Sequence, residues 1–245
     1  MSNSATTQAA PATGPIAPRQ VPLLQNGDHL SSVEFERRYA AMPDVKAELV
    51  EGVVFMASPV RGKQHGKPHG HIVRWLGNYS VETPGAEFYD DSTVRLDREN
   101  VVQPDALLMI EASALGQAHF DERGYIQNGP ELVAEASAST ASYDLHEKMR
   151  AYRRNGVLEY LVWRVDDNEV DWFILREGQY VRLEPVDGMY RSTVFPGLWL
   201  NAKALLEGDY KQFDATFREG LASPEHRAFV ERLAAHKNAP PSDAK

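Results

Sequence analysis

The chain has 245 residues, of which 42% are hydrophobic, and this is enough to form one sizeable core. It contains no cysteine, which excludes disulfides and thiolate metal sites. A net charge of −9 argues against a protein that coats nucleic acid with its whole surface, because phosphate neutralisation requires clustered Lys and Arg. No apolar stretch approaches the ~20 residues that span a bilayer. We therefore expect a cytoplasmic protein with no membrane partner.

The ends of the chain differ in composition from its middle. Residues 1–28 are rich in Ala, Thr, Gln and Pro and contain no aromatic residue, which predicts a disordered leader. We expect one folded domain at residues 29–208, a C-terminal helical extension at 209–237 and a disordered tail at 238–245.

The first folded elements have clear signals. Ser31 and Glu34 form a capping box, which predicts a helix that begins there and runs to about Met42. Residues 48–50 and 53–57 flank Glu51-Gly52, which predicts a hairpin that joins the main sheet. A helix that covers the sheet is then predicted from apolar residues at helical spacing, namely Ile72, Trp75, Leu76 and Tyr79.

The middle of the chain alternates strands with helices. Strands are expected at 87–89, 93–96 and 132–136, and the run VVQPDALLMI at 101–110 predicts the central strand. Residues 111–129 lack periodicity and are interpreted as a surface insert. A helix is predicted from Ser142 or Asp144, with Leu145, Met149 and Tyr152 facing inward.

The last third begins with strands joined by tight turns, at 159–165, 169–175 and 180–183, which predicts an antiparallel run. A short strand at 195–200 and helices at 202–206, 210–219 and 224–235 follow. The predicted fold class is therefore α/β, with a mixed central β-sheet flanked by helices.

Two predicted strands each carry an acid that a strand facing solvent would not need, Asp105 and Glu135. Mg²⁺ is commonly held by one or two carboxylates together with waters and phosphate oxygens. Lys148 follows on the predicted helix, on the flank of its buried stripe, close enough to reach the strand that carries Glu135. The alternative roles are structural: Asp105 caps a neighbouring turn, and Lys148 pairs with Asp144 at i, i+4 on the surface. Two acids and a lysine beside a strand pair favour phosphodiester chemistry.

These residues resemble those of the PD-(D/E)XK nuclease superfamily and, more narrowly, the Uma2 (DUF820) family of endonuclease-like proteins. The resemblance covers roughly residues 31–208 and rests on ELVEG at 48–52, Ser58-Pro59, His69, VVQPD, VAEASAST, DLHEKMRAYRRNGV, EYLVW and FPGLWL. It implies a restriction-endonuclease-like core. It also implies that Asp105 and Glu135 hold the metal, with Glu48 assisting and Glu51 as the fallback. The superfamily places a lysine two residues after the second acid, where this chain has Ser137, so Lys148 is the nearest candidate for that role.

Basic residues gather in two parts of the sequence. Residues 52–81 contain no acid, and a second group consists of Lys148, Arg150, Arg153 and Arg154. Either these residues form a positive face on an acidic body, or they lie on ordinary solvated surfaces. Substrate contacts are predicted for Lys67, His69 and Arg74, because the start of a helix can bind phosphate. A zinc site formed by His65, His69 and His71 is weakly supported, because His69 and His71 do not share a helix face.

The leading hypothesis is an endonuclease that depends on Mg²⁺ (or Mn²⁺) and hydrolyses phosphodiester bonds of nucleic acid, with DNA as the expected substrate. The alternative is a catalytically silent nuclease-fold module that binds a partner. Cation-dependent nicking of DNA would distinguish the two. A homodimer is also expected, because edge strands need cover and enzymes that cut both strands of a duplex commonly pair their sites.

Overall fold

The computed structural model of the chain describes residues 20–56 and 62–237. The expected tail at 238–245, most of the expected leader (residues 1–19), and the Ser58-Pro59 motif with Arg61 lie outside the described residues.

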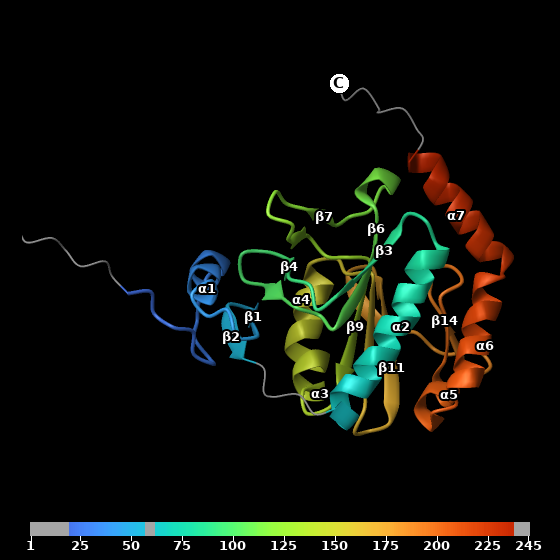
Figure 1. Cartoon of the computed structure of the whole chain (residues 1–245), viewed down its shortest axis with the longest axis horizontal. Coiled ribbons are helices and arrows are strands. Elements are labelled where there is room, and N and C mark those ends of the chain that lie inside the picture. Colours follow the sequence, from blue (N-terminus) through green and yellow to red (C-terminus); the bar gives the residue numbers. More distant parts are fainter. Residues whose placement is uncertain (1–19, 57–61, 238–245) are drawn as a thin grey trace, which may run out of the picture.

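A six-stranded mixed sheet forms the centre of the molecule (Figure 1). Within this sheet β9 (Leu132–Ser137) and β10 (Glu159–Arg164) run parallel, and the other neighbouring strands are antiparallel. The predicted α/β class with a mixed central sheet is therefore confirmed. In spatial order the strands are β12 (Gln179–Arg182), β11 (Glu169–Arg176), β10 (Glu159–Arg164), β9 (Leu132–Ser137), β6 (Ala106–Ile110) and β3 (Ala86–Asp90).

A second six-stranded sheet was not predicted, and it corrects three expectations. The predicted hairpin forms, but it belongs to this sheet rather than to the central one. The run 101–110 is two strands, one in each sheet. The expected surface insert contributes two strands and a short helical turn, Ala112–Ala114. Its Ala114, Ala118 and Ile126 side chains are buried. In order the strands are β2 (Val53–Met56), β1 (Ala47–Val50), β5 (Val101–Val102), β4 (Val94–Arg95), β8 (Ile126–Gln127) and β7 (His119–Phe120).

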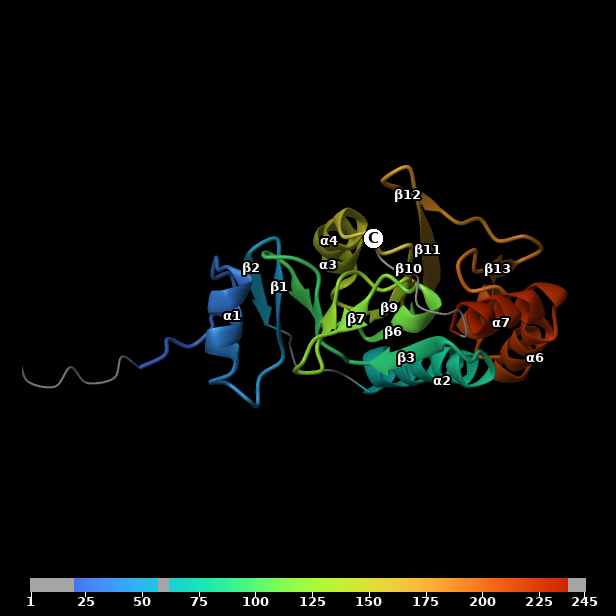
Figure 2. The same cartoon turned by 90° about the horizontal axis from the view of Figure 1, so that it is seen from above.

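Helices cover both faces of the central sheet, as Figure 2 shows from above. On one face, α2 (Lys67–Glu82) packs with the C-terminal helices α5 (Ala202–Glu207), α6 (Tyr210–Leu221) and α7 (Pro224–Lys237). The small sheet of β13 (Met189–Arg191) and β14 (Trp199–Asn201) lies with them. On the other face lie α3 (Ala141–Tyr143) and α4 (Met149–Arg154). The helices of the expected C-terminal extension thus share one core with the sheet.

The N-terminal helix α1 (Ser32–Tyr39) begins as the capping box predicts, with Ser31 accepting the Glu34 N–H, but it ends before Met42. Packed structure begins earlier than expected. Leu24 is buried, and Gly27 donates its N–H to the Val54 carbonyl at 2.8 Å. Residues 20–28 therefore do not fit a disordered leader, because Leu24 joins the apolar cluster around Phe35.

Glu159 anchors the segment between β13 and β14 to the central sheet. Its fully buried carboxylate accepts hydrogen bonds from the Ser192 and Thr193 hydroxyls and from the Thr193 and Val194 N–H groups, at 2.7–3.1 Å. Glu159→Ala should destabilise the fold by roughly 3 kcal/mol, because buried donors would lose their acceptor. That corresponds to a melting temperature lower by roughly 6–12 °C. Glu122→Ala, at an exposed residue, is the control, and equal melting curves for the two variants would contradict this role.

Candidate active site

Successive side chains of β9 point to opposite faces of the sheet, and its two polar residues lie on the same face. Leu132, Ala134 and Ala136 pack in the cluster under α2, so Glu135 and Ser137 point to the opposite face, toward α3 and α4. The β6–β9 register pairs Ala106 with Ala134 and so places Asp105 opposite Glu135. The backbone N–H of Asp105 donates to Glu135 Oε2 at 3.3 Å. The two acids chosen from the sequence are therefore neighbours at one end of the strand pair.

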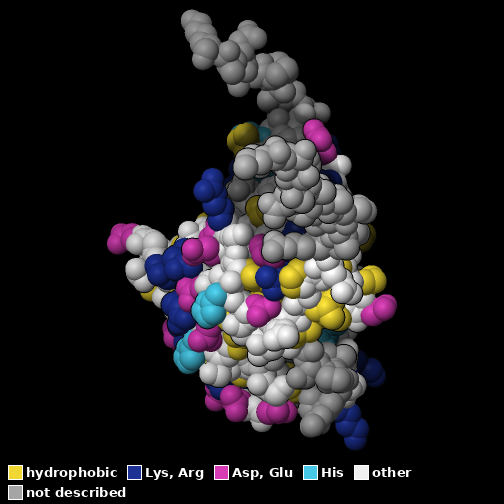
Figure 3. Space-filling model, turned by 90° about the vertical axis from the view of Figure 1, so that its left-hand side faces the viewer, with side chains coloured by type: hydrophobic (Ala, Val, Ile, Leu, Met, Phe, Trp, Pro, Cys, Tyr) yellow, Lys and Arg dark blue, Asp and Glu magenta, His cyan; other side chains and the backbone are white. Residues whose placement is uncertain are grey.

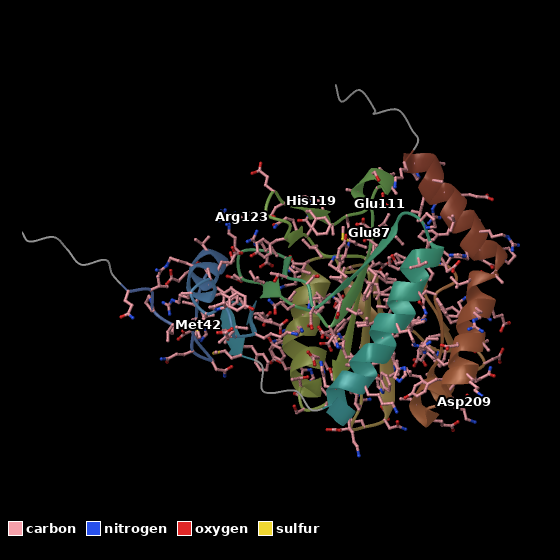
Figure 4. All side chains as sticks on the ribbon, viewed as in Figure 1. Met42, Glu87, Glu111, His119, Arg123 and Asp209 are labelled. Carbon is pink, nitrogen blue, oxygen red and sulfur yellow. The ribbon has the colours of Figure 1, made fainter. Side chains whose placement is uncertain are left out.

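The segment between β5 and β6 is where the chain passes from one sheet to the other. Pro104 is buried there and has no N–H to continue a strand ladder. Gln103 donates its N–H to Glu48 Oε1 at 2.6 Å, which ties β1 to this junction. Asp105 precedes β6 and Glu111 follows it, and Figure 4 shows Glu111 at the top of the molecule. The acids of the site thus lie at the opposite end of β6.

Lys148 lies on a helical segment that widens at its middle. Between α3 and α4, residues Asp144–Lys148 form a π-helical turn in which the Met149 N–H bonds to the Asp144 carbonyl, five residues back. Asp144, Lys148 and Tyr152 are buried along this segment, whereas Leu145 and Met149 are only partly buried. The expected position of Lys148 on the flank of an apolar stripe is therefore wrong. The stripe itself is polar at this end.

The Lys148 ammonium is enclosed by carboxylates. Its Nζ lies 2.6 Å from Glu135 Oε1, 3.1 Å from Glu48 Oε1 and 3.8 Å from Asp144 Oδ1. Lys148, Glu135, Asp105 and Glu48 are each no more than 6% exposed. Lys148 is thus not the surface partner of Asp144 that the structural alternative required.

The charges in this cluster are strongly coupled. Burial disfavours the ammonium, yet the pKa of Lys148 is raised well above its usual value because Glu135 and Glu48 stabilise the charged form. The pKa of Glu135 is also raised well above its usual value, because burial, together with Asp105, Asp144 and Glu48, outweighs the lowering by Lys148. Three carboxylates, those of Glu135, Glu48 and Asp144, thus share one ammonium in a region of low dielectric.

Two hydroxyl groups also donate hydrogen bonds to carboxylates of this cluster. Tyr152 donates to Glu135 Oε1 at 3.2 Å, and burial raises its pKa well above the usual value, so it keeps its proton. The Ser137 hydroxyl donates to Asp144 Oδ2. Ser137 thus holds Asp144 from β9, and Lys148 lies near the same carboxylate from the helical segment.

Comparison with known proteins identifies the family. The profile of the Uma2 family, described as "Putative restriction endonuclease", matches residues 33–203, from α1 to α5. The chain belongs to the Uma2 family. A crystal structure of a putative nuclease belonging to DUF820 from Anabaena variabilis ATCC 29413 superposes with a TM-score of 0.53 at 14% identity. The superposition covers 69% of this chain and 96% of that one, so the two share a fold. The comparison with curated proteins gave no match.

The predicted substrate contacts of this Uma2 chain do not all lie at the site. His69 Nε2 lies 3.0 Å from the Asp105 carbonyl and 2.8 Å from Asp90 Oδ1. Lys67 Nζ lies over the Tyr210 ring, 5.2 Å from its centroid, and Arg74 Nη1 bonds to both carboxylate oxygens of Asp214 at 2.7 and 2.9 Å. His69 is therefore beside the acids, whereas the other two side chains turn toward α6.

The second basic group does not form a positive face. Lys148 is buried, and Arg150 and Arg154 pair with Glu51 at 2.9 and 3.0 Å. The Glu51 carboxylate, named as a fallback ligand, is thus engaged by these arginines. On the side of the molecule that carries α1, Figure 3 shows basic side chains interspersed with acidic ones. For this part of the surface the interpretation as ordinary solvated faces holds.

The donor set suits a hard divalent cation. Asp105, Glu135 and Glu48 offer carboxylate oxygens, and the acids outnumber the single ammonium. Lys148, however, lies between Glu48 and Glu135. Among the described residues, the one group of three ligand atoms within 4.8 Å of one another is that of His69, Asp90 and Asp91, the last two exposed. The carboxylate oxygens of the three buried acids are suitable ligands for a cation, although the three do not form a group with ligand atoms within 4.8 Å of one another.

Three residues contact this cluster in roles that the sequence did not assign to them: Asp144, expected only as a surface partner of Lys148; Tyr152, expected only to face the core; and His65, considered only for a zinc site. The spacing of Asp144, Lys148 and Tyr152 at i, i+4 and i+8 was a usable signal, because it places three polar groups on one helix face. His65 lies on a π-helical turn, Gly62–Gly66, and no sequence pattern indicated its position.

No helix among the described residues has the length and apolar character needed to cross a bilayer.

Proposed function

We propose that this Uma2 protein is an endonuclease that depends on a divalent cation, Mg²⁺ or Mn²⁺, and hydrolyses phosphodiester bonds of DNA. The observation that carries the proposal is the buried Lys148 ammonium, 2.6 Å from Glu135 and 3.1 Å from Glu48, beside the strand pair at whose end Asp105 lies opposite Glu135. Burying a lysine and three acids is costly for the fold, and such clusters are typical of functional sites.

Asp105, Glu135 and Glu48 would hold the cation. When bound, it would polarise the phosphate and lower the pKa of the attacking water. The backbone N–H groups of Asp105 and Ala136 fix the two central acids, through Glu135 Oε2 and Asp105 Oδ2 respectively. These contacts hold the carboxylates in place before any ligand arrives.

Lys148 would supply the positive charge that the strand lacks at Ser137. Its ammonium can donate a hydrogen bond to the attacking water and stabilise the negative charge that develops on the phosphate. The Tyr152 hydroxyl, through its bond to Glu135, limits the positions that this carboxylate can adopt. A preorganised donor in a buried site acts more strongly than one in water.

The phosphate backbone would approach at the start of α2. Lys63 is exposed on the π-helical turn that leads into α2, and His69 lies beside Asp105, so these two side chains would contact the phosphates. Arg74 has no part in this proposal, because Asp214 engages it.

The direct test is incubation of supercoiled plasmid and single-stranded DNA with the protein in Mg²⁺, in Mn²⁺ and in EDTA. We expect nicking in the presence of either cation and none in EDTA. Cleavage that persists in EDTA would exclude the cation mechanism, and no cleavage of either substrate under any condition would favour the silent binding module.

Asp105→Asn should remove the stabilisation that the cation gives to the fold. The substitution keeps the volume and removes the charge, so the metal-free protein should melt within a few degrees of wild type. Saturating Mn²⁺ at ~100 Kd should stabilise the wild type by about 2.7 kcal/mol and the variant by much less. Thermal unfolding with and without Mn²⁺ measures this difference. An equal rise in melting temperature for both proteins would show that Asp105 is not a principal ligand.

Pairing of two chains stays a prediction. β12 and β7 lie at sheet edges, and cleavage of both strands of a duplex would use two sites related by two-fold symmetry. Light scattering at micromolar concentration should give the mass of a dimer, and a monomer mass would refute the prediction.

A further inference from the structure

The backbone of one residue, Ala136, holds two side chains of the site. The Ala136 N–H donates to Asp105 Oδ2 at 2.8 Å, and the Ala136 carbonyl lies 2.9 Å from His65 Nδ1, which donates to it. The next residue after Glu135 thus fixes both the carboxylate and the imidazole. A backbone carbonyl that accepts one ring N–H is the usual means of orienting a histidine that binds metal through its other nitrogen.

The remaining atoms of the two groups face each other. His65 Nε2 lies 3.5 Å from Asp105 Oδ1, which is too long for an effective hydrogen bond. With the ring proton on Nδ1, the neutral imidazole carries a lone pair on Nε2. In this neutral tautomer the Nε2 lone pair and the Asp105 carboxylate oxygen lie 3.5 Å apart, and both are suitable ligands for one cation. Each of these two groups is held by a backbone hydrogen bond to its other polar atom, so together they can supply two ligands to one cation.

His65, rather than its neighbour, supplies the available nitrogen. The His69 ring stacks on His65 with centroids 5.4 Å apart, but its Nε2 already contacts Asp90 and the Asp105 carbonyl. The His65 side chain is 23% exposed, whereas that of Asp105 is 8% exposed, so His65 is the more accessible of the two.

We propose that His65 Nε2 is a direct ligand, together with Asp105, of the cation in this site. The inference rests on the cation site of the proposed function and changes its expected selectivity. Mg²⁺ takes oxygen ligands and keeps several waters, whereas imidazole nitrogen favours transition-metal cations. The mixed donor set therefore selects Mn²⁺ or a later divalent transition metal over Mg²⁺.

The test uses His65→Asn in the full chain. The asparagine amide nitrogen takes the place of Nδ1 and can still donate to the Ala136 carbonyl, but nothing replaces Nε2. The matched control is His71→Asn, because the His71 ring stacks on Tyr210 with centroids 3.8 Å apart, away from Asp105. Asp105→Asn serves as the variant without a cation site. Mn²⁺ and Mg²⁺ affinities are measured by calorimetry. Nitrogen coordination is measured by electron spin echo envelope modulation, which detects coupling between bound Mn²⁺ and ¹⁴N.

We expect wild type and His71→Asn to show ¹⁴N coupling to Mn²⁺ and His65→Asn to lose it. Loss of Nε2 should weaken Mn²⁺ binding by at least about 10-fold, the scale seen when even the groups that orient a ligand are removed. Mg²⁺ affinity should change by no more than about 3-fold, because Mg²⁺ prefers oxygen ligands and water.

Several outcomes would overturn the proposal. If Mn²⁺ binds in a manner that depends on Asp105 but shows no ¹⁴N coupling, or keeps the coupling in His65→Asn, His65 is not a ligand and the proposed function is unaffected. Coupling that disappears only in His69→Asn would assign the nitrogen to the group of His69, Asp90 and Asp91. Mn²⁺ binding that Asp105→Asn leaves unchanged would defeat both this proposal and the cation site of the proposed function.

Discussion

Replacing Lys148 by methionine is expected to lower the rate of DNA cleavage by roughly 10²–10³-fold, the scale seen for the loss of one donor to a developing negative charge. The variant keeps most of the side-chain volume but removes the one ammonium within 4 Å of Glu135, Glu48 and Asp144. Because the carboxylates remain, cation binding should persist. Single-turnover cleavage and calorimetry measure the two effects separately.

Arg150→Met is the control for Lys148→Met. Arg150 lies two residues further on the same helical segment, but its guanidinium is exposed and pairs with Glu51. We expect cleavage by this variant to stay within a few-fold of wild type. Removing Lys148 also breaks a buried ion pair, which costs on the order of 3–5 kcal/mol, so rates must be compared well below the melting temperature of both variants. Cleavage at the wild-type rate by Lys148→Met would refute its catalytic role.

Glu135→Gln is expected to lower both cleavage and cation affinity, with a loss in rate of roughly 10³-fold or more, since ligand and electrostatic contributions disappear together. The carboxylate of Glu135 receives the Asp105 N–H, the Tyr152 hydroxyl and the Lys148 ammonium. A glutamine can present only one oxygen to these three donors. The affected quantities are the single-turnover rate and the calorimetric affinity for Mn²⁺.

Glu131, the residue that immediately precedes β9, provides a matched control. It is also buried, burial raises its pKa, and it accepts the Ile110 and Gln117 N–H groups at 2.9 and 2.8 Å, four residues away from Glu135. Glu131→Gln should therefore lower stability to a similar extent as Glu135→Gln while leaving cleavage and cation affinity within a few-fold of wild type. If both variants lose activity equally, the effect of Glu135→Gln reflects folding rather than chemistry.

Patterns that depend on local periodicity could be predicted from the sequence. All four apolar residues at helical spacing on α2 are buried, and the capping box of Ser31 begins α1. The strand that carries Glu135 was predicted to within one residue, because β9 lies inside the central sheet and is an apolar run with turn signals at each end. Asp105 and Glu135 could be chosen because a carboxylate inside such a run needs a partner.

Features set by tertiary structure could not be predicted. The run 101–110 looks like one strand because both of its halves are apolar, and only pairing with two different partners divides it at Pro104. The spacing of Asp144, Lys148 and Tyr152 places them on one helix face, but only packing against Glu48 and Glu135 shows that this polar face is buried. Leu24 is buried through contact with distant residues, which composition does not report.

The most direct test of the proposed site formed by Lys148 and the three acids is the single-turnover cleavage rate of four proteins. These are the wild type, Lys148→Met, Glu135→Gln and the double variant. If Lys148 and Glu135 act as one unit, the double variant should cleave within about 3-fold of the slower single variant, because the second loss removes nothing further. Penalties that multiply in the double variant would show that the two residues act independently. Wild-type cleavage by any of the three variants would contradict the assignment of this cluster as the active site.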